Sequence, residues 1–308
     1  MKEIGYDRPL FIQPFDHRGS FTRKFFDFSG QPRLEPNLDQ HSPIVAAKTL
    51  IYRGLLRAIE LGVDKEQVGV LVDAQYGAHI LDDARRRGIP TACPTEMSGQ
   101  SVFHFEYGAR WTDHIRYVQP NMIKVLVRYH PEDDALNNRE QLVRLKQISD
   151  YVHATDDHYF MFELLVPATT DEEKAADDYD VAMRPQRMIE SIREIQDYGV
   201  EPDIWKIEGL DRAEDARAVA AQTRSGDHRA KVGNILLGRG SNAEKVHEWL
   251  RVAAPIDGFI GFTVGRTNFS EPIKECMKAP TPDNANIAVE AIAQNYKGCV
   301  DVWLDAAS

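Results

Sequence analysis

Short apolar runs alternate with longer amphipathic stretches along most of the chain. The runs are rich in β-branched and aromatic residues, as strands are, and the stretches between them repeat apolar residues at helical spacing. This pattern predicts strands at Leu10 to Phe15, Val68 to Val72, Pro90 to Cys93, Met122 to Val127, Tyr159 to Val166, Pro202 to Ile207, Val232 to Leu237 and Gly258 to Val264.

Helices are expected between the strands and after the last one. They are predicted at Ser42 to Leu61, Tyr76 to Arg87, Phe105 to Val118, Asn138 to His153, Pro185 to Tyr198, Arg212 to Arg224, Asn242 to Ala253 and Asp283 to Tyr296. Strands and helices in this alternation build a parallel sheet, and a set of eight predicts an α/β fold, a (β/α)8 TIM barrel. With neither a linker nor an internal repeat, we expect one domain over residues 1–308.

Two polar segments fall outside these elements. Residues 29–42 begin with Gly and Pro residues and read as a loop, which we interpret as a connector rather than a mobile cover. Thr169 to Tyr179 follows the fifth strand, on the side where barrel active sites form, and is expected to be a solvated loop rather than a lid.

Charge and composition narrow the class of protein. The net charge of -11 disfavours nonspecific binding to nucleic acid or to an anionic membrane, so the expected partners are small molecules or further copies of the chain. An apolar leader and a membrane-length apolar run are both lacking, which predicts a cytoplasmic protein. The three cysteines form no CxxC pair, which argues against a disulfide framework or a thiolate zinc site.

Three charged residues lie within consecutive apolar strands: Lys124, Glu163 and Lys206. Alternation along the sixth strand places Lys206 on the face opposite its two large apolar neighbours, and therefore toward the barrel interior. An inward lysine is able to form a Schiff base with a carbonyl substrate, and a carboxylate between two lysines is able to shuttle protons. The alternative is a buried ion network that only fixes packing.

The ends of the first two strands carry further polar residues. Asp16 and Arg18 follow the first strand, and Asp73 follows the second, at the edge where barrel enzymes place reactive groups. We expect Asp16 to act on a substrate hydroxyl, and Arg18 and Asp73 to contact substrate. Capping of the following loop or helix is the alternative for all three.

Two Gly-Arg pairs follow the seventh and eighth strands, where barrels often bind phosphate. Glycine exposes backbone amides, and arginine adds bidentate contacts. The predicted phosphate-binding residues are Gly238, Arg239, Gly240, Ser241, Gly265 and Arg266. Two tight turns with surface arginines are the alternative.

Metal and nucleotide sites are not supported by the sequence. His114, His130 and His153 do not have metal-binding helical spacing, and His130 belongs to a segment expected to be a solvated loop. A class II metal aldolase remains an alternative, although the sequence shows no evident trio of metal ligands. With no Walker or GxGxxG motif, we expect neither a metal nor another cofactor.

Several motifs resemble the class I aldolases around tagatose 1,6-bisphosphate aldolase, and most closely the 5-dehydro-2-deoxyphosphogluconate aldolases of inositol catabolism. The resemblance covers nearly the whole chain and is carried by Phe15-Asp-His-Arg-Gly19, Leu71-Val-Asp-Ala-Gln-Tyr-Gly77, Ile123-Lys-Val-Leu-Val-Arg-Tyr129, Phe162-Glu-Leu-Leu165 and Asp203-Ile-Trp-Lys-Ile-Glu208. It implies that Lys206 is the Schiff-base lysine and Glu163 its acid/base partner, with Lys124 and Asp16 in the same pocket.

The resemblance implies a lyase that splits 5-dehydro-2-deoxy-6-phosphogluconate into dihydroxyacetone phosphate and malonate semialdehyde. His17, Gly209 and Leu210 differ from the glutamine, valine and proline usual in the tagatose enzymes, which argues against that substrate. Aldolases of tagatose bisphosphate or of a sulfonated sugar phosphate remain alternatives. So does a barrel that binds a phosphosugar for regulation.

Overall fold

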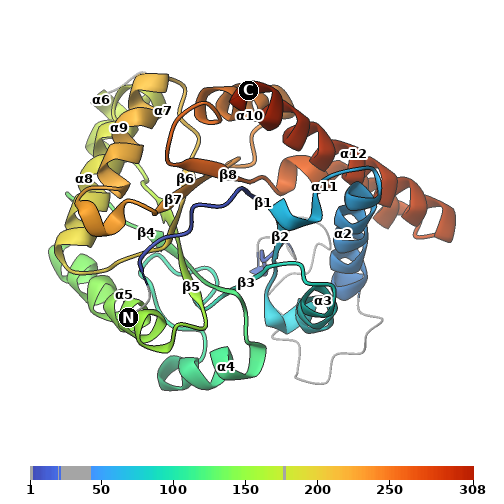
Figure 1. Cartoon of the computed structure of the whole chain (residues 1–308), viewed down its shortest axis with the longest axis horizontal. Coiled ribbons are helices and arrows are strands. Elements are labelled where there is room, and N and C mark those ends of the chain that lie inside the picture. The colour runs from blue at the N-terminus through green and yellow to red at the C-terminus, as the bar shows by residue number, and fades with distance from the viewer. Residues whose placement is uncertain (1–2, 20, 22–42, 176–177) are drawn as a thin grey trace.

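The computed structural model describes residues 3–19, 21, 43–175 and 178–308, and eight parallel strands form a closed barrel in chain order. Figure 1 shows the strands near the centre, with helices around them. The predicted TIM barrel is therefore confirmed. The strands are β1 Leu10–Pro14, β2 Val68–Leu71, β3 Thr91–Pro94, β4 Met122–Arg128, β5 Tyr159–Leu165, β6 Ile204–Glu208, β7 Gly233–Leu237 and β8 Phe259–Thr263.

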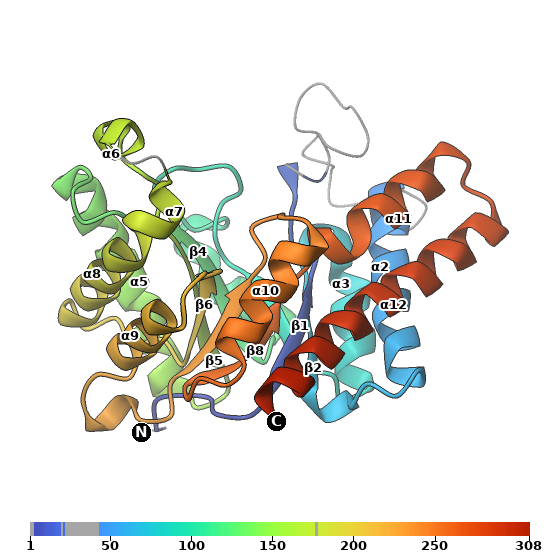
Figure 2. The same cartoon turned by 90° about the horizontal axis from the view of Figure 1, so that it is seen from above.

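The helices cover the outside of the barrel, and the long last helix packs along α2 and α11 (Figures 1 and 2). They are α2 Pro43–Glu60, α3 Ala74–Arg86, α4 Trp111–Val118, α5 Ala135–Thr155, α6 Thr170–Ala175, α7 Tyr179–Ala182, α8 Arg184–Asp197, α9 Ala213–Thr223, α10 Ala243–Ala253, α11 Arg266–Lys278 and α12 Pro282–Ala307. None of the described helices combines the length and the apolar character that a membrane crossing needs.

Each predicted strand is found within two residues of its expected bounds, whereas several helices differ from the prediction. The helix expected from Phe105 begins only at Trp111, because Phe105 bridges to Glu96 and Gly108 has a left-handed φ of 51°. The helix expected to end at Tyr296 continues to Ala307.

Helix α11 was not predicted. Pro272 lies inside it and removes the backbone donor that would bond to the Asn268 carbonyl one turn earlier. The side chain of Asn295, on α12, donates a 2.9 Å hydrogen bond to that carbonyl instead. A contact from a distant part of the chain thus satisfies the group that proline leaves free.

The barrel interior is apolar at one end and ionic at the other. On each of β4, β5 and β6, an apolar residue of the inner cluster precedes a charged residue by two positions, so both side chains lie on the same face. The pairs are Met122 with Lys124, Met161 with Glu163, and Ile204 with Lys206. The apolar layer closes the barrel beneath the charged one, which leaves the charged layer toward the carboxyl ends of the strands.

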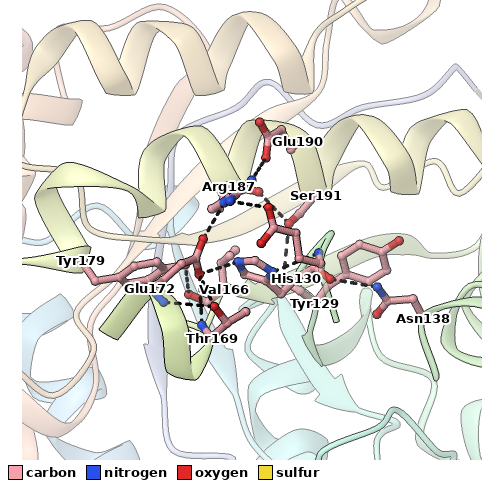
Figure 3. Close-up of polar contacts among 11 residues, drawn as sticks. Tyr129, His130, Asn138, Val166, Thr169, Glu172, Tyr179, Arg187, Glu190 and Ser191 are labelled. Atoms are coloured by element: carbon pink, nitrogen blue, oxygen red, sulfur yellow. Dashed lines mark hydrogen bonds and ion pairs between the residues drawn. The ribbon is translucent and has the colours of Figure 1, made fainter. Parts of the chain in front are cut away.

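The described part of the segment after β5 forms two short helices, α6 and α7, rather than a loop, although most of its residues are exposed, as the sequence suggested. Glu172 on α6 is buried, and Figure 3 shows it between His130, Thr169 and Arg187. His130 Nδ1 accepts from the Glu132 amide, so its Nε2 carries the hydrogen and faces Glu172 Oε2 at 2.9 Å. Arg187 Nε donates to Glu172 Oε1 at 2.7 Å. In the His130 segment, also expected to be solvated, Tyr129 and His130 are buried, whereas residues 132–134 are exposed as expected.

Two segments named in the sequence analysis lie wholly or partly outside the described residues. Residues 29–42 are one, and residues 176–177 of the predicted loop Thr169 to Tyr179 are the other.

Candidate active site

The ammonium group of Lys124 lies at the centre of the charged layer. Its Nζ is 2.9 Å from Asp16 Oδ2, 2.7 Å from Glu96 Oε1 and 2.8 Å from Glu163 Oε2. The same Glu163 oxygen lies 2.9 Å from Lys206 Nζ. All five side chains are buried or nearly so. The structure therefore brings together the four residues predicted to be catalytic, and adds Glu96.

Strand register explains how these side chains meet. Glu163 on β5 pairs directly with Lys206 on β6, whereas Lys124 on β4 pairs with Met161. Lys124 thus starts one layer lower than the other two, and its long side chain reaches up to the Glu163 carboxylate. The sequence placed the three residues on neighbouring strands, but the difference in layer comes from the stagger of the barrel.

The charges around Lys124 decide its protonation state. Burial alone would disfavour the ammonium, but Asp16, Glu163 and Glu96 outweigh it and raise the pKa of Lys124 well above its ordinary value. Lys124 is therefore a permanent cation and an unsuitable nucleophile. Lys206 has a carboxylate contact to Glu163 alone among the described residues, so its amine is the one available for attack on a carbonyl.

The three carboxylates differ in their affinity for protons. Burial opposes the charge on each, but Lys124 and Lys206 outweigh it for Asp16 and Glu163 and lower the pKa of both. For Glu96, burial prevails over Lys124 and Arg18, and its pKa is raised. Glu96 is therefore the most easily protonated of the three.

A cavity of about 210 Å³ opens onto this cluster. Lys206, Glu163 and Lys124 lie at its base, and Asp16, His17 and Arg18 form the wall beside them. The loop after β3 and the end of β4 form the far side. The residues on that far side are Glu96, Met97, Ser98, Gly99, Gln100, Ser101, Val102, Phe103, Leu126 and Arg128.

Two of the predicted contact residues are held by other parts of the chain. Arg18 lines the cavity, but its guanidinium lies 3.2 Å from Glu106 and donates to the Glu96 carbonyl at 2.5 Å. Asp73 does not line it: one carboxylate oxygen bonds to Lys48, and the other accepts from the Tyr76 amide as the N-cap of α3. Capping thus accounts for Asp73, and Arg18 positions the loop that carries Glu96.

The two predicted phosphate loops lie side by side but do not line the cavity. A Cβ placed on Gly240 would come within 2.7 Å of Arg266 Cζ, and Thr267 Oγ1 donates to the Ser241 carbonyl at 2.9 Å. Gly265 directly precedes α11. The N-terminus of this helix, which begins at Arg266, therefore presents backbone amides beside the Arg266 side chain. The charge of Arg266 acts on His17, which places it near the first-strand end of the site.

Arg239, from the loop after β7, is engaged by carboxylates of other elements. Its guanidinium forms ion pairs with Glu208, at 2.9 Å, and with Asp180 on α7. Glu208 also pairs with the buried Arg184 at 3.2 Å and accepts from the Val166 amide. This network joins the end of β6, two residues beyond Lys206, to α7 and α8.

Sequence reasoning missed Glu96 and the cavity wall formed by Arg128 and residues 97–103. Glu96 follows β3 beyond the strand's end, as Asp16 follows β1, and that position was the available signal. The loop after it was assigned to no element, so its return to the barrel mouth through the Glu96–Phe105 bridge was not foreseen. Within the described ranges, no group of three His, Cys, Asp or Glu side chains is arranged to hold a metal ion.

His17 is half-buried and lines the cavity. Burial lowers its pKa from 6.5 to about 4, while the charges of Asp16 and Arg266 act in opposite directions. Between these two pH values the unfolded chain binds a proton that the folded protein does not, so stability must fall as pH drops through this window. We expect the titration of His17 to lower the free energy of unfolding by about 1–3 kcal/mol between pH 7 and pH 4.

The measurement is urea denaturation of the parent and of His17→Gln across that pH range. The difference between the two proteins isolates His17 from other groups that titrate in the window, such as His114. Equal pH slopes for both proteins would show that the imidazole titrates normally.

The protein-family comparison matches residues 7–307 to a family described as an uncharacterized protein conserved in bacteria (DUF2090). This match spans the whole barrel and nearly the whole chain. The chain belongs to this family. No curated protein matches the chain.

Solved structures with the same fold include two aldolases, at sequence identities that show the fold alone. Fructose-bisphosphate aldolase from Plasmodium falciparum superposes with a TM-score of 0.65 at 9% identity, over 100% of this chain and 99% of that one. An archaeal fructose 1,6-bisphosphate aldolase gives 0.56 at 13%, over 94% of each chain. A structural-genomics target from Corynebacterium glutamicum gives 0.54 at 19%, over 96% of this chain and 88% of that one.

Proposed function

We propose that this member of the DUF2090 family is a class I aldolase whose Schiff-base lysine is Lys206. The observation that carries the proposal is the pair of lysines on one Glu163 oxygen, of which Lys124 is fixed by three carboxylates and Lys206 by one. Such a pair supplies a nucleophilic amine and, beside it, a fixed cation that stabilises developing negative charge.

The substrate we propose is 5-dehydro-2-deoxy-6-phosphogluconate. The Lys206 amine adds to the C5 carbonyl, and loss of water leaves an iminium. Removal of the C3 hydroxyl proton then breaks the C3–C4 bond, which releases malonate semialdehyde while the electron pair enters the iminium and forms an enamine. Protonation of the enamine at C4 and hydrolysis release dihydroxyacetone phosphate and the free amine.

Proton transfers fall to the carboxylates beside the lysines. Glu163 contacts Lys206 directly, so it is placed to move protons during iminium formation and hydrolysis. Asp16 or Glu163 takes the C3 hydroxyl proton. We assign the phosphate on C6 to Arg266 and the backbone amides of the loops at Gly238–Ser241 and Gly265–Arg266. These loops lie beside the cavity rather than in its wall, near His17, and a phosphate held there positions the adjacent C5 carbonyl. The fold shared with two fructose-bisphosphate aldolases supports a reaction of this class.

Borohydride trapping tests the proposal. Incubation with dihydroxyacetone phosphate and borohydride should add the mass of one reduced adduct to the chain, and peptide mapping should locate it on Lys206. The Lys206→Met variant is the control and should remain unmodified. An adduct on Lys124, or no adduct on a folded protein, would contradict the assignment.

A substrate panel then tests the substrate itself. We expect cleavage of 5-dehydro-2-deoxy-6-phosphogluconate, with release of dihydroxyacetone phosphate, to exceed cleavage of tagatose 1,6-bisphosphate and of sulfonated sugar phosphates. The reverse order would keep the Schiff-base chemistry but replace the substrate.

A further inference from the structure

The far end of the cavity carries a cation that the chemistry proposed above leaves unused. Lys124, Leu126 and Arg128 alternate along β4 on the same face, and all three line the cavity. Lys124 lies at its base among the carboxylates, and Arg128 lies four residues further on, about 13 Å along the strand toward the mouth. The cavity thus joins the Schiff-base lysine to an arginine at its opening.

Arg128 differs from Arg18, the other arginine in the cavity wall. Arg18 is engaged by Glu106 and by the Glu96 carbonyl. Arg128 Nη1 donates to the Gln100 carbonyl at 3.1 Å, but no carboxylate of the described residues forms an ion pair with it. Its remaining guanidinium donors are therefore available to an anion in the cavity.

The loop that contacts Arg128 is held in place at both ends. The Met97 amide donates to the His104 carbonyl at 2.8 Å, and the Phe103 amide donates to the Gln141 side chain at 2.9 Å. Between these anchors, Ser98 and Ser101 bring hydroxyl groups to the cavity wall. Of the described residues, those at the opening thus comprise Arg128, which has no ion pair, and neutral hydrogen-bonding groups, whereas the base holds three carboxylates with two lysines.

We propose that Arg128, with the hydroxyl-bearing loop Ser98–Ser101, binds the carboxylate at the end of the substrate remote from the Schiff base. This inference rests on the proposed aldolase function. It assigns a binding site to the half of the substrate that leaves as malonate semialdehyde. At the base of the cavity three carboxylates already balance the two lysines, whereas Arg128 at the mouth has no carboxylate partner among the described residues, so an anionic end group binds more favourably at the mouth. The cavity therefore orients the substrate with its keto group at Lys206 and its carboxylate at Arg128.

The condensation direction tests this assignment, because the acceptor aldehyde then carries the distal group alone. Dihydroxyacetone phosphate is combined either with malonate semialdehyde or with propanal, which has the same chain length and no charge. The parent should prefer malonate semialdehyde. Arg128→Met should lower kcat/KM for that acceptor by about 10- to 100-fold, as loss of a charge-assisted hydrogen-bonded pair does, and affect propanal far less.

Two further variants separate recognition from general effects of charge. Arg128→Lys keeps the charge but loses the bidentate geometry, so it should give an intermediate preference. Arg139→Met removes an exposed arginine of α5 outside the cavity and should leave both acceptors unchanged. An equal fall for both acceptors in Arg128→Met, or an unchanged ratio, would overturn the inference.

Trapping with dihydroxyacetone phosphate separates failure of this inference from failure of the aldolase proposal. That compound lacks the distal carboxylate, so the Arg128→Met protein should still form the reduced adduct on Lys206. Loss of the adduct in this variant alone would assign Arg128 to the phosphate and overturn the inference. Absence of the adduct from the parent protein would instead contradict the aldolase function itself.

Discussion

Replacement of Lys206 by methionine is expected to lower the cleavage rate by about four orders of magnitude or more, the scale seen when a covalent nucleophile is removed. Lys206 is the buried amine that faces the cavity with a single described carboxylate contact. Methionine retains much of the lysine stem's volume and removes only the reactive nitrogen, so the loss should appear in kcat rather than in folding.

Steady-state cleavage of 5-dehydro-2-deoxy-6-phosphogluconate, coupled to detection of dihydroxyacetone phosphate, measures this effect. Lys274→Met, which removes an exposed lysine of α11, serves as the matched control and should retain full activity. Thermal unfolding of all three proteins checks that each is folded. Turnover within tenfold of the parent in folded Lys206→Met would rule out a Schiff base at this residue.

Strand alternation explains why much of the site could be predicted from the sequence. Side chains of a strand point alternately to its two faces. The large apolar neighbours of Lys206 pack on the outer face, so Lys206 points to the inner one. The same argument applies to Lys124 and Glu163. Their side chains are therefore fixed by local pattern and by strand order, both of which the sequence carries.

Contacts between distant segments explain what the sequence did not predict. Glu96 reaches Lys124 because the loop after it folds back through a bridge to Phe105. Arg239 was assigned to a phosphate, but Glu208 and Asp180 from other elements hold it. Helix α11 accommodates its internal proline because the Asn295 side chain donates to the Asn268 carbonyl that proline leaves without a donor. None of these partners lies close enough in the chain for a local pattern to indicate it.

Replacement of Lys124 by methionine should produce a large loss of stability, because it leaves three buried carboxylates without their shared cation. Removal of one partner of a buried ion network costs about 3–5 kcal/mol of unfolding free energy. We expect a loss of this size at pH 7.5, measured by urea denaturation. Addition of Glu96→Gln to Lys124→Met should recover part of it, since one uncompensated charge is then gone.

The pH dependence of this loss distinguishes an electrostatic cause from lost packing. In the parent, the pKa values of Asp16 and Glu163 are lowered, so their contribution to stability is present above the ordinary carboxyl pKa and is lost as pH falls. Without Lys124, Lys206 is the remaining lysine that opposes burial, and we expect burial to prevail and to raise the folded-state pKa values above those of the unfolded chain. Stability is then lost as pH rises through these values and regained on acidification.

The gap in stability between parent and Lys124→Met should therefore narrow from pH 7.5 to pH 5, whereas a packing defect would give a constant gap. A constant gap of several kcal/mol would mean that lost packing, and not the carboxylate charges, causes the loss of stability. A narrowing gap would establish that Lys124 holds Glu163 ionised beside Lys206. That ionised carboxylate is what the proposed chemistry needs to accept the protons that Lys206 releases on attacking a carbonyl.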